Sequence, residues 1–197
     1  MFNPPPADLA RRDPLIHRAS TTTTWCRSHK AGYAAIFFGR KQAGRWDAPN
    51  GDYGVLYLGA GERCAFMESI GRSYLRTRFV PASELRTRLL TKIRFSRELR
   101  LIDLVSSGGL TRLGAEGSLV NGLGYRNSQR WSDALRSHPA GVDGIHYRSR
   151  YDPALTACAL FDHCESFVEI VENCGAWADE PLLLGTILDH YQLGTDL

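Results

Sequence analysis

The pattern of apolar and polar positions predicts a chain of short strands separated by a few helices. The run at 55–58 is apolar except for one tyrosine and is bounded by glycines, as is typical of a buried strand. Beyond it, Phe66, Ile70 and Tyr74 recur at helical spacing, which predicts an amphipathic helix over 62–76. A strand followed closely by a helix is therefore the first clear structural unit of the chain.

The same two patterns continue through the C-terminal half. The last helix follows Pro181, a residue that suits the first turn of a helix. Because the strands do not alternate regularly with helices, we expect an α+β fold with a mixed or antiparallel β core flanked by helices. Strands are predicted at 91–96, 100–105, 144–147, 156–161 and 167–172, and helices at 128–137 and 182–191.

Length and composition favour one compact domain. The 197 residues exceed the usual size of a single domain only modestly, and 43% of them are hydrophobic, enough for a sizeable core. We expect residues 1–13, with three consecutive prolines from Pro4, to form an extended N-terminal arm and residues 14–197 to form the domain. The arm lacks the apolar centre of a secretory signal, and no apolar stretch is long enough to span a membrane.

Charge and cysteine content add two expectations. The net charge is only +3, and three of the 24 basic residues are lysines. Arginines are frequent between Arg72 and Arg100, and we interpret them as a solvated face that can also meet an acidic partner. The five cysteines are odd in number and include no C-x-x-C pair, so we expect free thiols and a cytoplasmic, reducing location.

Three residues on consecutive elements indicate a site for an anionic ligand. Turn-forming residues predict a loop over 44–54 that presents Arg45. Tyr57 lies in the predicted strand, and Glu68 lies in the predicted helix between small residues that leave room for a ligand. Each also has an ordinary explanation, since Glu68 can be a solvated glutamate and Tyr57 a core tyrosine.

The C-terminal half makes this pattern specific. The sequence resembles the RES-domain family, which is named for an arginine, a glutamate and a serine and whose members are often toxins paired with a helix-turn-helix antitoxin. Asp47 stands where many relatives have asparagine. Four segments match in order over roughly 14–162: His17-Arg18; Gly44-Arg45-Trp46 with the following Tyr57; Ala65 to Glu68; and Asp143 to Ser149 followed by Leu160-Phe161-Asp162.

The resemblance implies a fold similar to ADP-ribosyltransferase toxins and an enzyme that cleaves the nicotinamide–ribose bond of NAD by hydrolysis or phosphorolysis. It implies catalytic roles for Glu68, Arg45 and Ser149, and NAD binding by Arg18, Arg45, Tyr57 and Ser149. NAD is then a substrate, and neither a permanent cofactor nor a metal is expected. The expected partner is a helix-turn-helix antitoxin, with nucleic acid involved only through it, and homo-oligomerisation stays open.

The residue types suit this chemistry. Cleavage builds oxocarbenium character on the ribose, which a carboxylate such as Glu68 can stabilise. The guanidinium groups of Arg18 and Arg45 offer planar forks for the diphosphate. The face of Tyr57 can hold the cationic nicotinamide ring. Ser149 can bond to the ribose or to Glu68, although a serine there also suits a turn.

Other interpretations stay open. ADP-ribose can be passed to a protein, or an arginine-rich face can bind nucleic acid or protein without catalysis. The glycines at 59–61 only begin a dinucleotide fingerprint. Cys64 or Cys158 with a histidine would suit a hydrolase, whereas 162–164 lacks a second ligand pair for zinc. Glycines between 108 and 124 predict a long flexible loop that would serve as a lid.

Overall fold

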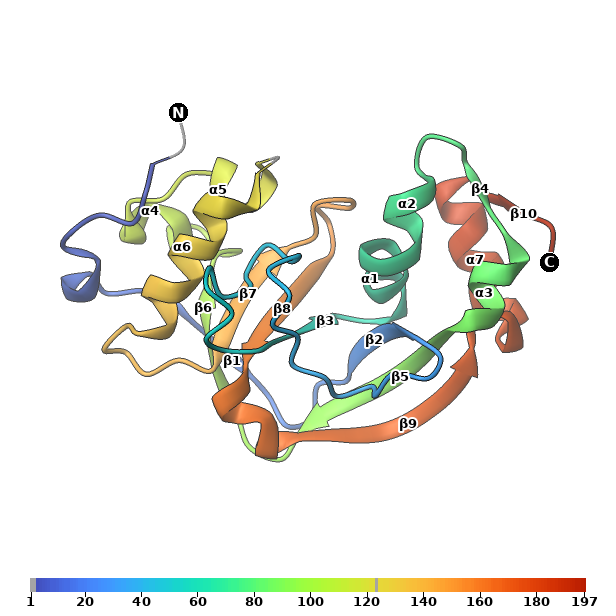
Figure 1. The fold of residues 1–197 in the computed structure, drawn as a ribbon, viewed down its shortest axis with the longest axis horizontal. Helices are drawn as coiled ribbons and strands as arrows, with labels where there is room; N and C mark the ends of the chain where they lie inside the picture. The colour runs from blue at the N-terminus through green and yellow to red at the C-terminus, as the bar shows by residue number, and fades with distance from the viewer. Residues whose placement is uncertain (1–2, 123) are drawn as a thin grey trace.

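One twisted, mixed sheet forms the frame of the molecule (Figure 1). The computed structural model describes residues 3–122 and 124–197. Strand order is β1-β6-β7-β8-β3-β2-β5-β9, and neighbours are antiparallel except for the parallel pair of β6 and β7. The strands are β1 (Ile16–Ala19), β2 (Trp25–Lys30), β3 (Val55–Gly59), β5 (Arg88–Phe95), β6 (Leu99–Asp103), β7 (Gly144–Arg148), β8 (Thr156–Phe161) and β9 (Val168–Ala176).

Helices lie over the sheet in two groups (Figure 1). Beside β6 and β7 lie α4 (Gly109–Leu113), α5 (Ser118–Asn121) and α6 (Tyr125–Arg136). Beside the other end lie α1 (Glu62–Phe66), α2 (Arg72–Tyr74), α3 (Ala82–Thr87), α7 (Pro181–Tyr191) and a small parallel pair, β4 (Phe79–Val80) with β10 (Gly194–Thr195). Shorter turns are η1 (Leu9–Arg11), the π-helical η2 (Met67–Gly71), η3 (Asp162–Phe167) and η4 (Trp177–Asp179). No helix in the described part of the chain combines the length and apolar character needed to cross a membrane.

Each helix group has its own apolar core. Trp131 of α6 packs with Ile145 of β7 in the first core, and Phe66 of α1 packs with Trp177 in the second. A third core, which includes Leu56, covers the other face of the sheet. The two helix groups therefore flank the middle of the sheet, where a cavity opens between them.

The expected α+β class is confirmed, and the predicted elements agree in type with the observed ones. The predicted strand at 156–161 coincides with β8, and the predicted helix at 182–191 begins one residue earlier, at Pro181. The sequence pattern did not indicate β1 or β2. In β2 the polar residues Arg27 and Ser28 line a cavity, which breaks the apolar alternation that identifies a strand.

The glycine-rich segment corrects an expectation. The described part of 108–124 is not a long flexible loop, because it forms α4 and α5. Leu113 and Leu119 are buried in the first core. Gly114 has a φ of 74° and ends α4 in the left-handed conformation that glycine adopts without strain. The described glycines here delimit short helices rather than a flexible loop.

The segment before Pro14 lies against α6. The carbonyl oxygen of Asn3 accepts hydrogen bonds from Trp131 Nε1 at 3.0 Å and Asn127 Nδ2 at 3.1 Å. Leu9, in the 3-10 turn η1, is buried in the first core. The segment is thus folded onto the rest of the protein over its described part, and a domain starting at residue 14 stays a prediction.

A buried carboxylate ties β6 to β7. Asp143 accepts hydrogen bonds from both terminal nitrogens of Arg97, at 2.7 and 2.9 Å, and from the amide of Arg100 at 2.8 Å. The paired Asp143 raises the pKa of Arg97. Because β6 and β7 are parallel, no tight hairpin can join them. Asp143 supplies a direct link at the start of this pair.

We expect Asp143→Ala to lower the free energy of unfolding by roughly 2 to 4 kcal/mol, because it leaves Arg97 and the Arg100 amide without their acceptor. The matched control is Glu98→Ala, which breaks only the exposed pair of Glu98 with Arg18 and should cost less than about 1 kcal/mol. Urea unfolding of both variants tests this. Equal losses would show that Asp143 contributes no more than a surface ion pair.

Candidate functional site

A π-helical turn places Glu68 at the cavity. The predicted helix is observed as α1, η2 and α2 in succession, so residues 62–74 wind continuously but widen at 67–71. One turn of this kind shifts the register of the side chains that follow it, and such turns are frequent at functional sites. Met67 and Ile70 are buried on the core side, while Glu68 remains half-buried and lines the cavity.

Ser149 holds Glu68 from behind. It lies in the turn between β7 and β8 and is fully buried. Its hydroxyl donates to Glu68 Oε1 at 2.5 Å and accepts bonds from the amides of Tyr151 at 3.2 Å and Asp152 at 3.3 Å. The serine therefore caps the turn, as its ordinary interpretation expects, and also makes the bond to Glu68 that was one of the two contacts expected of it.

Arg45 reaches the cavity from the loop that precedes β3. Its guanidinium group donates to the carbonyl oxygens of Leu119 at 3.3 Å and Gly122 at 3.0 Å, and lies 4.9 Å from the ring centre of Tyr125. The side chain is 7% exposed, and burial lowers its pKa. No described residue supplies a carboxylate to this guanidinium within ion-pair distance. A buried cation whose described partners are carbonyl oxygens, the Ser128 hydroxyl and an aromatic ring, all of them neutral, favours an anionic ligand.

Tyr57 and Asp47 fix the shape of the arginine loop. The Tyr57 hydroxyl donates to Asp47 Oδ1 at 2.7 Å and accepts from the Trp46 amide at 2.8 Å, while Asp47 Oδ2 accepts from the Gly44 amide at 2.7 Å. Burial, followed by the charge of Asp47, raises the pKa of Tyr57 well above its ordinary value. Aspartate rather than asparagine suits this position, because both of its oxygens act as acceptors.

Helix α6 supports the same loop from the other side. Gln129 Nε2 donates to the Gly44 carbonyl at 2.9 Å, and Ser132 Oγ donates to the Trp46 carbonyl at 2.6 Å. Both side chains are buried. The backbone on either side of Arg45 is therefore held by buried hydrogen bonds, which are costly to break.

These residues surround one cavity of about 250 Å³. Arg45, Tyr57 and Glu68 line it together, and Ser149 touches it only through Glu68. Among the described lining residues, Glu68 is the one acid. The arginines and tyrosines of the wall are Arg27, Arg45, Arg72, Arg88, Arg148, Arg150, Tyr57, Tyr125, Tyr147 and Tyr151.

Arg18 does not join this group, which corrects the sequence-based assignment. It lies on β1, at the far edge of the sheet, and its exposed side chain pairs with Glu98 at 2.7 Å. Arg27 of β2 lines the cavity instead, donates to the carbonyl oxygen of Ala35, and has its pKa lowered to about 10 by burial. Sequence reasoning missed it because β2 itself was not recognised.

Only some of the arginines between Arg72 and Arg100 form the expected solvated face. Arg72 and Arg88 line the cavity, and Arg97 is bound to Asp143. Arg86 and Arg94 are exposed. The arginines of 72–100 thus serve different local purposes rather than one continuous surface function.

The geometry weakens two of the open interpretations. Burial raises the pKa of Cys64 to about 12 and that of the fully buried Cys158 well above its ordinary value, so neither is prepared as a thiolate nucleophile. The glycines at 59–61 follow β3, which is antiparallel to both neighbours, so no parallel βαβ unit of the dinucleotide-binding type is formed. The described cysteines are free thiols, as expected.

The fold and site define an α+β protein whose single cavity brings one carboxylate together with several guanidinium groups. The RES-domain family model matches residues 16–183, which is most of the chain. The chain therefore belongs to the RES-domain family.

The fold has a counterpart among solved structures. It is similar to a chain in the crystal structure of the M. tuberculosis MbcT-MbcA toxin-antitoxin complex, with a TM-score of 0.65 and 15% sequence identity over 93% of this chain and 98% of that chain. At this identity the likeness establishes a shared fold. No curated protein matches the sequence.

We expect Tyr57→Phe to lower the free energy of unfolding by about 1 to 3 kcal/mol, because it leaves the buried Asp47 oxygen and the Trp46 amide without a partner. Tyr33→Phe, at a position that is 63% exposed, is the matched control and should be nearly neutral. Guanidinium unfolding measures both. A neutral Tyr57→Phe would mean that the loop around Arg45 does not depend on this hydroxyl.

Proposed function

We propose that this protein cleaves the bond between nicotinamide and ribose in NAD, by hydrolysis or phosphorolysis. The observation that carries the proposal is the pairing of one oriented carboxylate, Glu68, with a cavity wall of arginines. Cleavage needs a negative charge at the ribose, and binding needs positive charge at the diphosphate. Family membership supports the same proposal.

Glu68 would act on the ribose. The C–N bond breaks with its electron pair passing to nicotinamide, which leaves as a neutral molecule and restores its aromatic ring without a proton donor. Positive charge then develops on the ribose, where Glu68 stabilises it electrostatically. The oxygen of water or phosphate attacks the same carbon, and a proton is released from water. A single carboxylate suffices for this scheme, in agreement with a wall whose described residues include one acid.

The arginines would hold the diphosphate. Arg45 and Arg27 are the most enclosed of them, each anchored on backbone carbonyls that leave part of the guanidinium fork free for a ligand. Arginine binds phosphate oxygens through two parallel N–H groups, which fixes orientation as well as charge. Tyr57, to which the sequence assigns contact with the cationic nicotinamide ring, lines the same cavity together with Tyr147, and either ring would supply this contact.

A second cavity of about 260 Å³ lies next to the first and suits the adenosine half of a dinucleotide. The two cavities share Arg27, Ser28 and Arg88 in their walls. The second adds the exposed aromatic rings of Tyr33 and Phe37, on which an adenine can stack. The shared arginines then lie between two nucleoside-sized spaces, where the diphosphate of NAD belongs.

We further propose that the protein is the toxin of a toxin–antitoxin pair. This rests on family membership and on the fold that it shares with a chain of a toxin–antitoxin complex. Expression of the wild-type protein should lower cellular NAD and arrest growth, whereas Glu68→Gln at the same level should do neither. If the wild type and Glu68→Gln both arrested growth, toxicity would not depend on Glu68.

Product analysis tests the reaction itself. Purified protein is incubated with NAD, with and without inorganic phosphate, and the products are identified by mass spectrometry. Free ADP-ribose would indicate hydrolysis, and ADP-ribose 1″-phosphate formed only with phosphate would indicate phosphorolysis. A protein that gains the mass of ADP-ribose would indicate transfer of ADP-ribose instead. Intact NAD would refute the proposal.

We expect Glu68→Gln to reduce NAD turnover by about 100-fold or more, the scale of losing one electrostatic stabiliser. The fold should persist, because the amide oxygen of glutamine can still accept the Ser149 hydroxyl. Glu62→Gln, on the same helical segment but outside the cavity wall, is the matched control and should keep full activity. Equal turnover by folded Glu68→Gln and wild type would remove Glu68 from the mechanism.

We expect Arg27→Gln to raise KM for NAD by roughly tenfold or more, because it removes a charge-assisted bond to phosphate. Arg18→Gln should leave both kcat and KM unchanged, since Arg18 faces solvent beside Glu98. Initial-rate kinetics of the two variants give the comparison, with thermal melting to confirm that each is folded. A larger effect of Arg18→Gln would restore the sequence-based assignment.

A further inference from the structure

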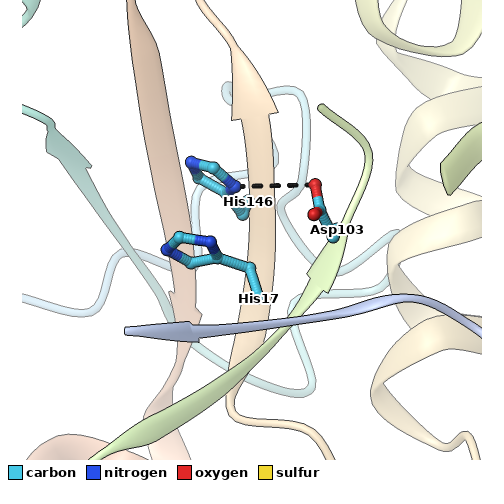
Figure 2. A group of neighbouring side chains, drawn as sticks. All are labelled: His17, Asp103 and His146. Carbon is cyan, nitrogen blue, oxygen red and sulfur yellow. Dashed lines mark ion pairs between the residues drawn. The ribbon is translucent and has the colours of Figure 1, made fainter. Parts of the chain in front are cut away.

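Two histidines and an aspartate from distant segments meet on the sheet face opposite the cavity. Figure 2 shows His17 of β1, Asp103 at the end of β6 and His146 of β7 side by side. The register explains the meeting, because His17 lies opposite Leu101, two residues before Asp103, and Asp103 lies opposite His146. Tyr147 lines the cavity, and side chains alternate along a strand, so His146 points to the other face.

The distances suit a shared cation better than a direct bond. His146 Nδ1 lies 3.7 Å from Asp103 Oδ1, which is too long for a hydrogen bond. One nitrogen of His17 completes a set of three ligand atoms that all lie within 4.8 Å of one another. Two ligands of a tetrahedral Zn²⁺, each about 2.0–2.1 Å from the metal, are roughly 3.3 Å apart. The pair of His146 and Asp103 already has nearly this spacing, whereas the half-buried His17, which stacks on the His146 ring at 3.9 Å, has to turn its ring so that one nitrogen faces the same metal.

The environment leaves one ligand atom without a partner. His146 is 7% exposed, and its Nδ1 has no hydrogen-bond partner among the described residues. Trp25 packs edge-on at 6.3 Å and His17 stacks on the same ring at 3.9 Å, so water has little access. A metal binds an imidazole nitrogen that carries no proton, and Nδ1 of His146 is a ring nitrogen left without a partner beside a carboxylate.

Asp103 is held in place by a second set of contacts. Its Oδ1 accepts hydrogen bonds from the amides of Val105 at 2.8 Å and Ser106 at 3.0 Å. Backbone contacts of this kind orient ligating carboxylates in metal sites. The carboxylate therefore stays charged and fixed beside an imidazole nitrogen that lacks a partner.

We propose that His17, Asp103 and His146 form a Zn²⁺ site that fastens β1 to the sheet. Two imidazoles and one carboxylate suit zinc, whereas Mg²⁺ and Ca²⁺ prefer oxygen ligands. A water molecule would fill the fourth position beside His17, which is the least buried of the three ligands. The metal would stabilise β1 most. This four-residue edge strand pairs with β6, and the metal would add a link to β7 as well.

Calorimetric titration tests the site on the full-length protein after treatment with a chelator. ZnCl₂ should bind with a stoichiometry of one per chain and raise the melting temperature. His17→Ala and Asp103→Asn should each weaken binding by about 100-fold or more, beyond the range seen on loss of an outer contact. Asp103→Asn keeps an acceptor oxygen for the two amides, so its fold does not depend on the charge.

Two control variants separate this cluster from adventitious binding. His190→Ala removes a histidine of α7, and Cys174→Ser removes the thiol that is least buried. Both should bind Zn²⁺ as the wild type does. The proposal is overturned if the wild type binds no Zn²⁺, if His17→Ala and Asp103→Asn bind it unchanged, or if either control abolishes binding. NAD turnover is not part of this test, so the two proposals can fail separately.

Discussion

The hydrogen bond from Ser149 to Glu68 is the constraint on which the arrangement of the site depends. Two backbone amides donate to the serine oxygen, so its proton is directed at Glu68 Oε1. A half-buried glutamate without this bond would be free to turn toward the arginines that share its cavity, such as Arg72 or Arg150. The turn between β7 and β8, which contains Ser149, thus fixes the position of the Glu68 carboxylate. The π-helical turn places Glu68 within hydrogen-bond distance of that serine. The mechanism proposed for NAD needs that charge beneath the ribose rather than neutralised by a guanidinium group.

Backbone carbonyl oxygens hold two arginines of the cavity wall away from Glu68, just as backbone amides hold Ser149. Arg45 donates to the carbonyl oxygen of Leu119 in α5 and to that of Gly122, the residue that follows this helix. Arg27 likewise rests on the carbonyl of Ala35. Carbonyl dipoles make burial of a cation tolerable but do not neutralise it, so the positive potential of the cavity persists. If the guanidinium groups of Arg45 and Arg27 served only the stability of the fold, we would expect each to be paired with a carboxylate. Their unpaired state is the physical reason to expect a diphosphate or a comparable anion.

The sequence was sufficient where local pattern and local chemistry agree. The apolar run before Gly59 and the helical spacing of Phe66 and Ile70 identify β3 and the helix that carries Glu68, and the turn residues of 44–54 identify the loop that carries Arg45. It was insufficient where a position is defined by the rest of the fold. Arg27 and Arg18 lie on short strands with similarly polar sequences, and only the order of strands places β2 inside the sheet, between β3 and β5, and β1 at its edge. The glycines of 108–124 misled for a related reason, because a glycine that ends a helix and a glycine in a flexible loop are alike in sequence.

The histidine cluster illustrates the same limit and also bears on how the two proposed sites relate. His17, Asp103 and His146 have no common spacing in the sequence, and a metal was not expected there; the parallel pairing of β6 with β7 and the antiparallel pairing of β1 with β6 bring them together. His146 and Tyr147 are adjacent in β7 but point to opposite faces, one into this cluster and the other into the cavity. An ion bound at the cluster could therefore displace the cavity residues only by moving the backbone of β7, which hydrogen bonds to β6 and β8 already hold on both sides. A strand fixed in this way transmits little displacement, so the cluster should stabilise the fold while leaving the positions of the side chains around Glu68 as they are.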